Sequence, residues 1–319
     1  MNNNIFNQLS LAYSPMSSYD FAILKNDPLV IQAIENSTLY IITKRPVLYF
    51  NNVAIDEKAW ALKFEIHQNE NSEILYCSLP LDQTNLFAKI DNPISLRFWY
   101  NDEKYAKDGL VKNQVVGIQF YTGEEYLKFR LLLTPEVFLK HYDMKDLTAT
   151  VNRNIRDFRK YQVLYVGKAT EQSIIKRLSN HSKLQQILSL EHNISSGELP
   201  KDETVLLLFT LTPEFLSRSY TSEDDIKHIL PILKGELPSQ SKITSDAEKA
   251  LIKLISPKYN SIQYKSYPKG LDGLYNDDYD NIVYYIKDEI QLTYANSTIR
   301  GGRLKSKVIV KDKQELILE

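Results

Sequence analysis

Residues 163–181 read VLYVGKATEQSIIKRLSNH, an apolar strand followed by a glycine turn and an amphipathic helical pattern. Tyr165, Lys168, Arg177 and His181 are not required to build a strand, a turn and a helix. Arg177 and His181 are four residues apart, a spacing that places both on one face of a helix. A phenol, a guanidinium and an imidazole on adjoining elements can bind a phosphodiester, offset charge in its transition state and transfer a proton. The stretch therefore predicts a site for phosphate chemistry.

The composition is that of a globular protein without an overall cationic character. The chain has 319 residues with a formal charge of -1, and 43% of the residues are hydrophobic and 25% are charged, so two domains are expected. Cys77 is the single cysteine, which excludes a disulfide framework and a cysteine-rich zinc site and fits a reducing cytoplasm. The first residues do not resemble a secretory signal, and no apolar run approaches the roughly 20 residues that span a bilayer. We expect a cytoplasmic protein that does not enter the membrane.

Two kinds of periodicity divide the chain. Residues 1–36 are expected to be partly helical, and short aromatic and β-branched runs follow to about residue 138, as in an antiparallel sandwich or barrel. From about residue 142 strands (YQVLYVG, TVLLLFTL, NIVYYI) alternate with helices (SIIKRLSNHSKLQQIL, DAEKALIKLI). The expected fold class is α+β, with an N-terminal antiparallel β-rich domain followed by a small α/β domain. In that second domain, helices flank a short mixed or antiparallel sheet.

A carboxylate further along the chain can complete the site with a metal ion. Glu248 lies in TSDAEKALIKLISPKYN (residues 244–260), in the first turn of an expected helix that ends before Pro257. The pattern Ser245-x-x-Glu248 also fits a capping box, in which the glutamate only satisfies the backbone at the start of a helix. From the sequence, Glu248 can be either a metal ligand or a helix cap.

The order of these motifs resembles the GIY-YIG nuclease domain. LYVG, R-L-x-x-H, AE-x-x-LI and P-x-YN follow one another within about residues 145–262. The R-x-x-x-H spacing is similar to that of family members that act as restriction endonucleases. The resemblance implies a GIY-YIG-like nuclease domain at 141–265. The strand and turn patterns add a β-rich recognition or interaction domain at 1–140 and a C-terminal β/turn extension with a basic tail at 266–319.

Roles for individual residues are what the resemblance implies. Tyr165 would contact the scissile phosphate or the attacking water, and Gly167 would permit a tight exit from the strand. Arg177 would bind the phosphate and stabilise the developing charge, while His181 would assist proton transfer or hold the phosphate. Glu248 would be the single protein ligand of one Mg²⁺ or Mn²⁺, with waters in the other positions.

The first signature of the family, GIY, is not found before LYVG, where residues 147–162 read LTATVNRNIRDFRKYQ. The first signature tyrosine often acts as the general base in this family, so another group would have to replace it. Tyr161 is one alternative, because alternation along a strand would place it on the face of Tyr165. Tyr142 and His181, a residue type whose ordinary pKa of about 6.5 suits neutral pH, are the other two.

Positive charge gathers around the motif. Residues 151–200 carry eight lysines and arginines against four acidic residues, and a second basic run covers residues 300–313. Such patches attract phosphate irrespective of base sequence, and a solvated helix face is the alternative. We assign Lys168 and Lys176 to contact with nucleic acid, and the resemblance adds Asn260 as a structural residue near the phosphate.

Three hypotheses follow. The first is a Mg²⁺-dependent endonuclease that hydrolyses DNA phosphodiester bonds in restriction or anti-phage defence, with RNA and a homo-oligomeric state left open. The second is a catalytically inactive GIY-YIG-like module that binds nucleic acid or a partner. The third is a structural protein in which Glu248 only caps its helix. The first hypothesis requires four side chains to converge on one small surface: Tyr165, Arg177, His181 and Glu248. A tyrosine from a neighbouring strand beside them would favour it over the second.

Overall fold

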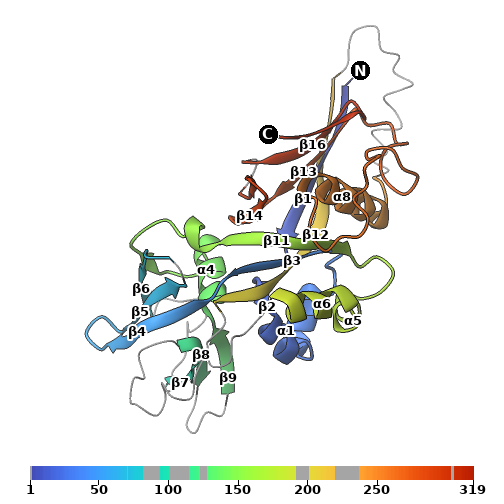
Figure 1. The fold of residues 1–319 in the computed structure, drawn as a ribbon. Coiled ribbons are helices and arrows are strands. Elements are labelled where there is room, and N and C mark those ends of the chain that lie inside the picture. Colours follow the sequence, from blue (N-terminus) through green and yellow to red (C-terminus); the bar gives the residue numbers. More distant parts are fainter. Residues whose placement is uncertain are drawn as a thin grey trace. The chain divides into compact units, whose positions relative to one another are not determined.

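The computed structural model describes residues 2–69, 71–81, 94–100, 115–122, 128–191, 201–219, 237–302 and 305–319. The chain forms two compact units (Figure 1). Unit 1 comprises Met1–Arg45, Arg159–Asn193 and Thr204–Glu319, and unit 2 comprises Pro46–Phe158 and Ile194–Glu203. In the described ranges, no helix has both the length and the apolar character needed to cross a membrane.

Unit 2 is built from strands that are close in the sequence. Its seven-stranded sheet has the order β10-β6-β5-β4-β8-β7, with β9 paired to β8, and its described pairs are antiparallel. Helix α4 (Pro135–Asp143) covers the core, where the rings of Phe138 and Phe64 meet edge to face at 4.9 Å. The strands are β4 (Leu48–Asp56), β5 (Ala61–Gln68), β6 (Leu75–Pro80), β7 (Ile94–Tyr100), β8 (Val115–Thr122), β9 (Lys128–Leu133) and β10 (Thr150–Val151).

Unit 1 contains a mixed sheet of ten strands that come from distant parts of the chain. The order is β15-β14-β11-β3-β12-β1-β13-β16-β17, with β2 paired to β12; β1–β13 and β11–β14 are parallel pairs. Strands β3, β11 and β12 (blue, green and yellow in Figure 1) lie side by side although the chain between them is long. The strands are β1 (Asn2–Leu11), β2 (Met16–Ser17), β3 (Leu39–Pro46), β11 (Lys160–Lys168), β12 (Asp202–Ser219), β13 (Asn281–Ile286), β14 (Gln291–Tyr294), β15 (Ser297–Arg300), β16 (Lys307–Lys311) and β17 (Glu315–Leu318).

Helices pack on both faces of this sheet. Alternation along β3 sends Leu39 and Ile41 into the core shared with α8 (Gln240–Ile255), and Tyr40 and Ile42 into the core on the opposite face. That second core is shared with helices from two parts of the chain. They are α1 (Ser18–Leu24), α2 (Pro28–Ile34), α5 (Ile174–Ser179) and α6 (Ser182–Glu191).

The expected fold, an N-terminal antiparallel β domain followed by a small GIY-YIG-like α/β domain, is wrong. The described residues contain more strand than helix (43% strand and 23% helix), and unit 1 carries a large mixed sheet. The physical reason is that β1 and β3, from the N-terminal part, pair with β11, β12 and β13. For the same reason the two units differ from the expected division into 1–140, 141–265 and 266–319.

Candidate active site

Two neighbouring antiparallel strands carry the centre of the candidate site. Tyr40 on β3 and Tyr165 on β11 stack with their ring centroids 6.0 Å apart, and Tyr40 lies opposite Gly167 in the strand register. A Cβ atom at Gly167 would lie 2.6 Å from atoms of both rings, so only glycine leaves room for the pair. Gly167 therefore lies within β11 and accommodates the two tyrosines, whereas the sequence indicated a turn at the exit of the strand.

A β-bulge in β11 determines which side chains face the site. The register with β3 shifts between Val163 and Tyr165, and both Leu164 and Tyr165 lie on the side of α5 and α6. Tyr161 and Val163 belong to the core under α8, where the Tyr161 ring is 5.5 Å from the guanidinium carbon of Arg45. The extra residue of a bulge breaks the alternation of side chains. Tyr161 therefore does not share a face with Tyr165, contrary to expectation.

His181 is fixed through both of its ring nitrogens. The helix expected at 173–188 is divided into α5 and α6, and His181 lies in the break, so it does not share a helical face with Arg177. Its Nδ1 accepts a hydrogen bond from the Leu184 backbone N–H at 3.0 Å, and its Nε2 lies 2.7 Å from the Tyr40 hydroxyl. Because Nδ1 accepts, the neutral ring carries its proton on Nε2 and donates it to Tyr40. Burial, reinforced by the charge of Arg177, lowers the pKa of His181 to about 4.

The hydroxyl oxygen of Tyr40 accepts a second hydrogen bond. Arg177 Nε donates to it at 3.2 Å, and Tyr165 interacts with both Tyr40 and Arg177. Two donors on one oxygen favour its phenolate form, whereas burial opposes that charge and raises the pKa of Tyr40 above its ordinary value. Burial likewise raises the pKa of Tyr165. Tyr40 is therefore protonated at neutral pH, but its oxygen already has the donors that a phenolate requires.

Glu248 lies in the middle of α8 and not at its start. The helix begins after Ser239, whose side chain accepts from the backbone at its first turn, so the capping box proposed for Ser245 and Glu248 is wrong. The carboxylate is only 8% exposed, and its Oε2 is 3.5 Å from Lys168 Nζ, which also donates to Ser245 Oγ at 2.8 Å. Burial raises the pKa of Glu248, and Lys168 opposes the shift. The contact with Lys168 joins the carboxylate to β11, the strand that carries Tyr165.

Glu248 is the residue that would hold a divalent metal, as its single protein ligand. Within the described ranges, no group of three or more histidine, cysteine, aspartate or glutamate side chains could hold a metal. Any ion here would bind one carboxylate and complete its shell with water, an arrangement that Mg²⁺ accepts. A buried carboxylate requires a cationic partner, a role that Lys168 fills. Lys168 Nζ also lies 4.0 Å from Asp272 Oδ2, so its ammonium group has a second carboxylate nearby when a metal binds Glu248.

Asn260 holds the backbone of β11 beside Tyr165. Its Oδ1 accepts from the Val166 N–H at 2.9 Å, and its Nδ2 donates to the Val166 carbonyl at 2.8 Å. Because these bonds engage both polar groups of the amide, the structural role expected for Asn260 fits the geometry. The expected contact of Asn260 with nucleic acid stays a prediction.

The basic residues of the expected face over residues 151–183 are divided between the two units, and some of them are buried or paired. Arg159 is 0% exposed, and Arg153 forms an ion pair with Glu73 inside unit 2 at 3.1 Å. Glu198, counted among the acidic residues, lies outside the described residues. The positive side chains of unit 1 that are exposed or half-buried around the tyrosine pair are Lys168, Lys176, Arg177 and Lys183.

The basic run near the C-terminus is largely engaged in internal contacts. Lys305 forms an ion pair with Glu289, and Lys313 Nζ donates to the Asp277 carbonyl at 2.6 Å. Arg303 lies outside the described residues. This run therefore offers less free positive charge than its sequence suggests.

The sequence did not identify Tyr40, because unit 2 separates it from LYVG in the chain. The signal was nevertheless present: Leu39-Tyr40-Ile41 has the same apolar-Tyr-apolar order as Leu164-Tyr165-Val166. Tyr142, an alternative base, stacks on Phe138 within unit 2, at 6.1 Å between ring centroids. Tyr40 is thus the tyrosine that the structure brings to the site.

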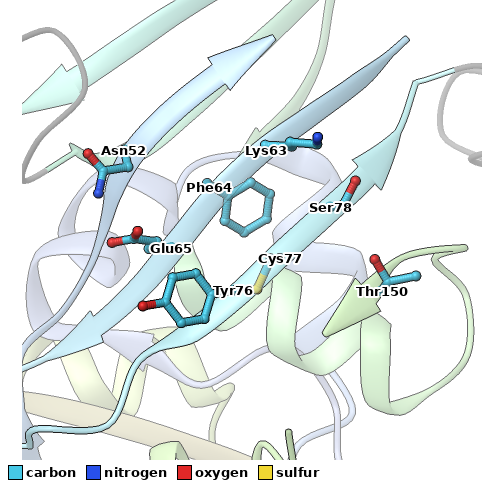
Figure 2. A pocket seen from close by; sticks show the side chains of 8 residues that line it. All are labelled: Asn52, Lys63, Phe64, Glu65, Tyr76, Cys77, Ser78 and Thr150. Atoms are coloured by element: carbon cyan, nitrogen blue, oxygen red, sulfur yellow. The ribbon is translucent and has the colours of Figure 1, made fainter. Parts of the chain in front are cut away.

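Unit 2 has a hollow of about 340 Å³ over β5 and β6 (Figure 2). The lysine and the glutamate that line it are paired with close neighbours: Lys63 with Asp56 at 2.6 Å, and Glu65 with His67 at 2.7 Å. The hollow therefore lacks the converging unpaired groups of a catalytic site. Its lining residues are Asn52, Lys63, Phe64, Glu65, Tyr76, Cys77, Ser78 and Thr150.

Comparison of the chain with protein-family models, with curated proteins and with solved structures finds no match.

Proposed function

We propose that the protein is a metal-dependent endonuclease that hydrolyses DNA phosphodiester bonds, in the manner of the GIY-YIG nucleases that its motifs resemble. The observation that carries the proposal is the hydroxyl oxygen of Tyr40, which receives hydrogen bonds from His181 and Arg177 beside the stacked ring of Tyr165. A tyrosine from the neighbouring strand thus stands next to the motif whose first signature is missing. Restriction or anti-phage defence is the biological setting that the resemblance adds to the proposal.

Tyr40 is the proposed general base. Its phenolate removes a proton from the attacking water, and the water oxygen forms a bond to phosphorus. One ester P–O bond breaks, and the leaving oxygen departs as an alkoxide that takes a proton from solvent water. Arg177 offsets the negative charge that develops on the phosphate. His181 is neutral and donates its Nε2 proton to Tyr40, so it acts as a positioning residue and not as the base. When bound at Glu248, Mg²⁺ or Mn²⁺ would supply further charge stabilisation at the phosphate.

The second candidate is a catalytically inactive module that binds nucleic acid or a partner. Its main support was the absence of a first tyrosine, and Tyr40 weakens that support. The third candidate is a structural or interaction protein, and only its assignment of Glu248 as a helix cap is contradicted, by the position of Glu248 inside α8. Cleavage assays therefore decide between the first two.

The test is cleavage of a supercoiled plasmid, a linear duplex and a single-stranded RNA in Mg²⁺ or Mn²⁺, with EDTA as the control. Tyr40→Phe removes only the hydroxyl and is expected to slow cleavage by about 10²–10⁴-fold, the usual contribution of a general base. Tyr161→Phe makes the same change on the other face of the sheet and should leave the rate close to that of wild type.

Wild-type rates in Tyr40→Phe would remove this residue from the mechanism. A wild-type protein that binds DNA but cleaves none of the three substrates would favour the inactive module.

A further inference from the structure

A segment that follows α8, residues 264–274, lies along the candidate site but has no part in the proposed chemistry. We name it the rim segment. Burial raises the pKa of Tyr264, and the charges of Glu248 and Asp272 raise it further. Lys249 Nζ lies 5.7 Å from the Tyr264 ring centroid and forms an ion pair with Asp272. The rim segment is thus attached to α8 beside Glu248.

A buried carboxylate fixes the far end of the rim segment. Asp246, 1% exposed on α8, accepts hydrogen bonds from the Leu274 backbone N–H at 2.8 Å and from the hydroxyls of Tyr267 and Tyr284 at 2.7 Å each. Hydrogen bonds of this kind offset the cost of burying the carboxylate. A Cβ atom at Gly273 would collide with Asp246, so the close approach requires glycine at that position.

Leu271 projects into solvent between these two attachments. It is 90% exposed, the highest value among the exposed large hydrophobic side chains of the described residues. The next residue, Asp272, lies 4.0 Å from the ammonium nitrogen of Lys168, which in turn contacts Glu248. An apolar side chain is therefore held one residue away from the polar network of the site.

We propose that Leu271 is an apolar wedge that inserts at a base step of a DNA duplex next to the cleaved phosphate. The inference rests on the proposed nuclease function and names duplex DNA as the ligand of the rim segment. Apolar side chains inserted between base pairs unstack them and kink the duplex. The attachments through Asp246 and Lys249 hold the wedge in place when it meets the stacked bases.

The test compares Leu271→Ser with Leu29→Ser, a matched change at a side chain that is 77% exposed on α2. Each variant is given a fully paired duplex and the same duplex with one mismatch at the cleavage position mapped with wild-type protein. Leu271→Ser is expected to cut the paired duplex about tenfold more slowly and the mismatched duplex at nearly the wild-type rate, because a mismatch already weakens stacking. Leu29→Ser should match wild type on both.

DNA bending provides a readout that does not depend on cleavage. A duplex labelled at both ends is bound to Glu248→Gln and to the double variant Glu248→Gln/Leu271→Ser, and the bend is measured by energy transfer. If Leu271 acts as a wedge, the DNA bend is smaller with the double variant than with Glu248→Gln. An equal bend, or an equal loss of cleavage on paired and mismatched duplexes, would overturn it. If wild type binds DNA but cuts nothing, the nuclease proposal fails while the bending result still decides the wedge. Absence of DNA binding would overturn both.

Discussion

Units 1 and 2 are both rich in strands, but they are assembled in different ways. In unit 2, β4, β5 and β6 are consecutive in the chain and pair as hairpins. In unit 1, β3 and β11 are adjacent in the sheet, but most of unit 2 lies between them in the sequence. The candidate site lies in unit 1, on the paired strands β3 and β11. The comparison teaches that the candidate site depends on a pairing of strands that are far apart in the sequence, which local patterns do not reveal.

The largest expected effect is on the cleavage rate, and it is tested by changing one carboxylate in each unit. Glu248→Gln in unit 1 removes the proposed metal ligand, and cleavage should fall by a factor of thousands, since metal stabilisation contributes several kcal/mol and each ~1.4 kcal/mol is tenfold in rate. Glu65→Gln in unit 2 makes the same change at a carboxylate beside His67 and should leave the rate unchanged. Cleavage rate, DNA affinity and thermal midpoint are measured for both.

Folding and DNA binding should persist in Glu248→Gln, because glutamine has the same shape and one negative charge near the phosphate has gone. Full cutting activity in this variant would end the assignment of Glu248 as a metal ligand. A loss of cutting in Glu65→Gln instead would move the site to unit 2.

Much of the secondary structure of unit 1 could be predicted from its sequence, but the pairing of its strands could not. NIVYYI coincides with β13, and DAEKALIKLI lies within α8, because apolar periodicity reports burial directly. Strand β1 was missed because buried asparagines mask its alternation: Asn3 and Asn7 occupy the same face as Ile5 and Leu9. No local pattern indicated that β1 and β3 pair with strands from the second half of the chain.

The residues of the candidate site could likewise be predicted only in part from the sequence. Tyr165, Arg177, His181 and Glu248 could be selected because their residue types and order resemble a known family. Tyr161 was selected as well, because a β-bulge leaves no mark in an apolar run and a strict alternation was assumed. The cap interpretation of Glu248 failed because the start of a helix depends on which serine is used, and Ser239 is the N-cap.

The second prediction compares a glycine in each unit. Gly167→Ala places a methyl group 2.6 Å from both tyrosine rings, whereas Gly117→Ala on β8 meets the tip of the Leu132 side chain at 3.1 Å. We expect Gly167→Ala to lower the free energy of unfolding by about 1–3 kcal/mol and to slow cleavage by roughly 100-fold, since small displacements at a reacting centre have large effects. Denaturant unfolding and cleavage rates check this. Equal effects of the two substitutions would show that Gly167 has no special relation to the tyrosines.

The third prediction concerns the pH dependence of cleavage. Burial raises the pKa of Tyr40, so its phenolate is a minor form at neutral pH, and the rate should rise about tenfold per pH unit toward alkaline pH. His181, with a pKa of about 4, is neutral throughout this range, so a rate controlled by His181 as base would be level above about pH 5. The measurement is kcat/KM from pH 5.5 to 9, with Tyr40→Phe as the variant that should lose the slope. A level profile in wild type would contradict Tyr40 as the base.

The smallest expected effect concerns phosphate attraction and compares two lysines of unit 1 with two arginines of unit 2. Lys176 is exposed and Lys183 half-buried in unit 1, near Arg177 and His181. Removing both by substitution with alanine should reduce the slope of log affinity against log salt by roughly one unit per lost phosphate contact. Arg153 and Arg156 belong to unit 2, and their double alanine variant should retain the wild-type slope. Equilibrium binding of a duplex is measured between low and moderate salt in the Glu248→Gln background, so that cleavage does not interfere. A reduced slope only in the arginine variant would place the main phosphate contacts on unit 2, and the lysines around the tyrosine pair would then be ordinary solvated surface.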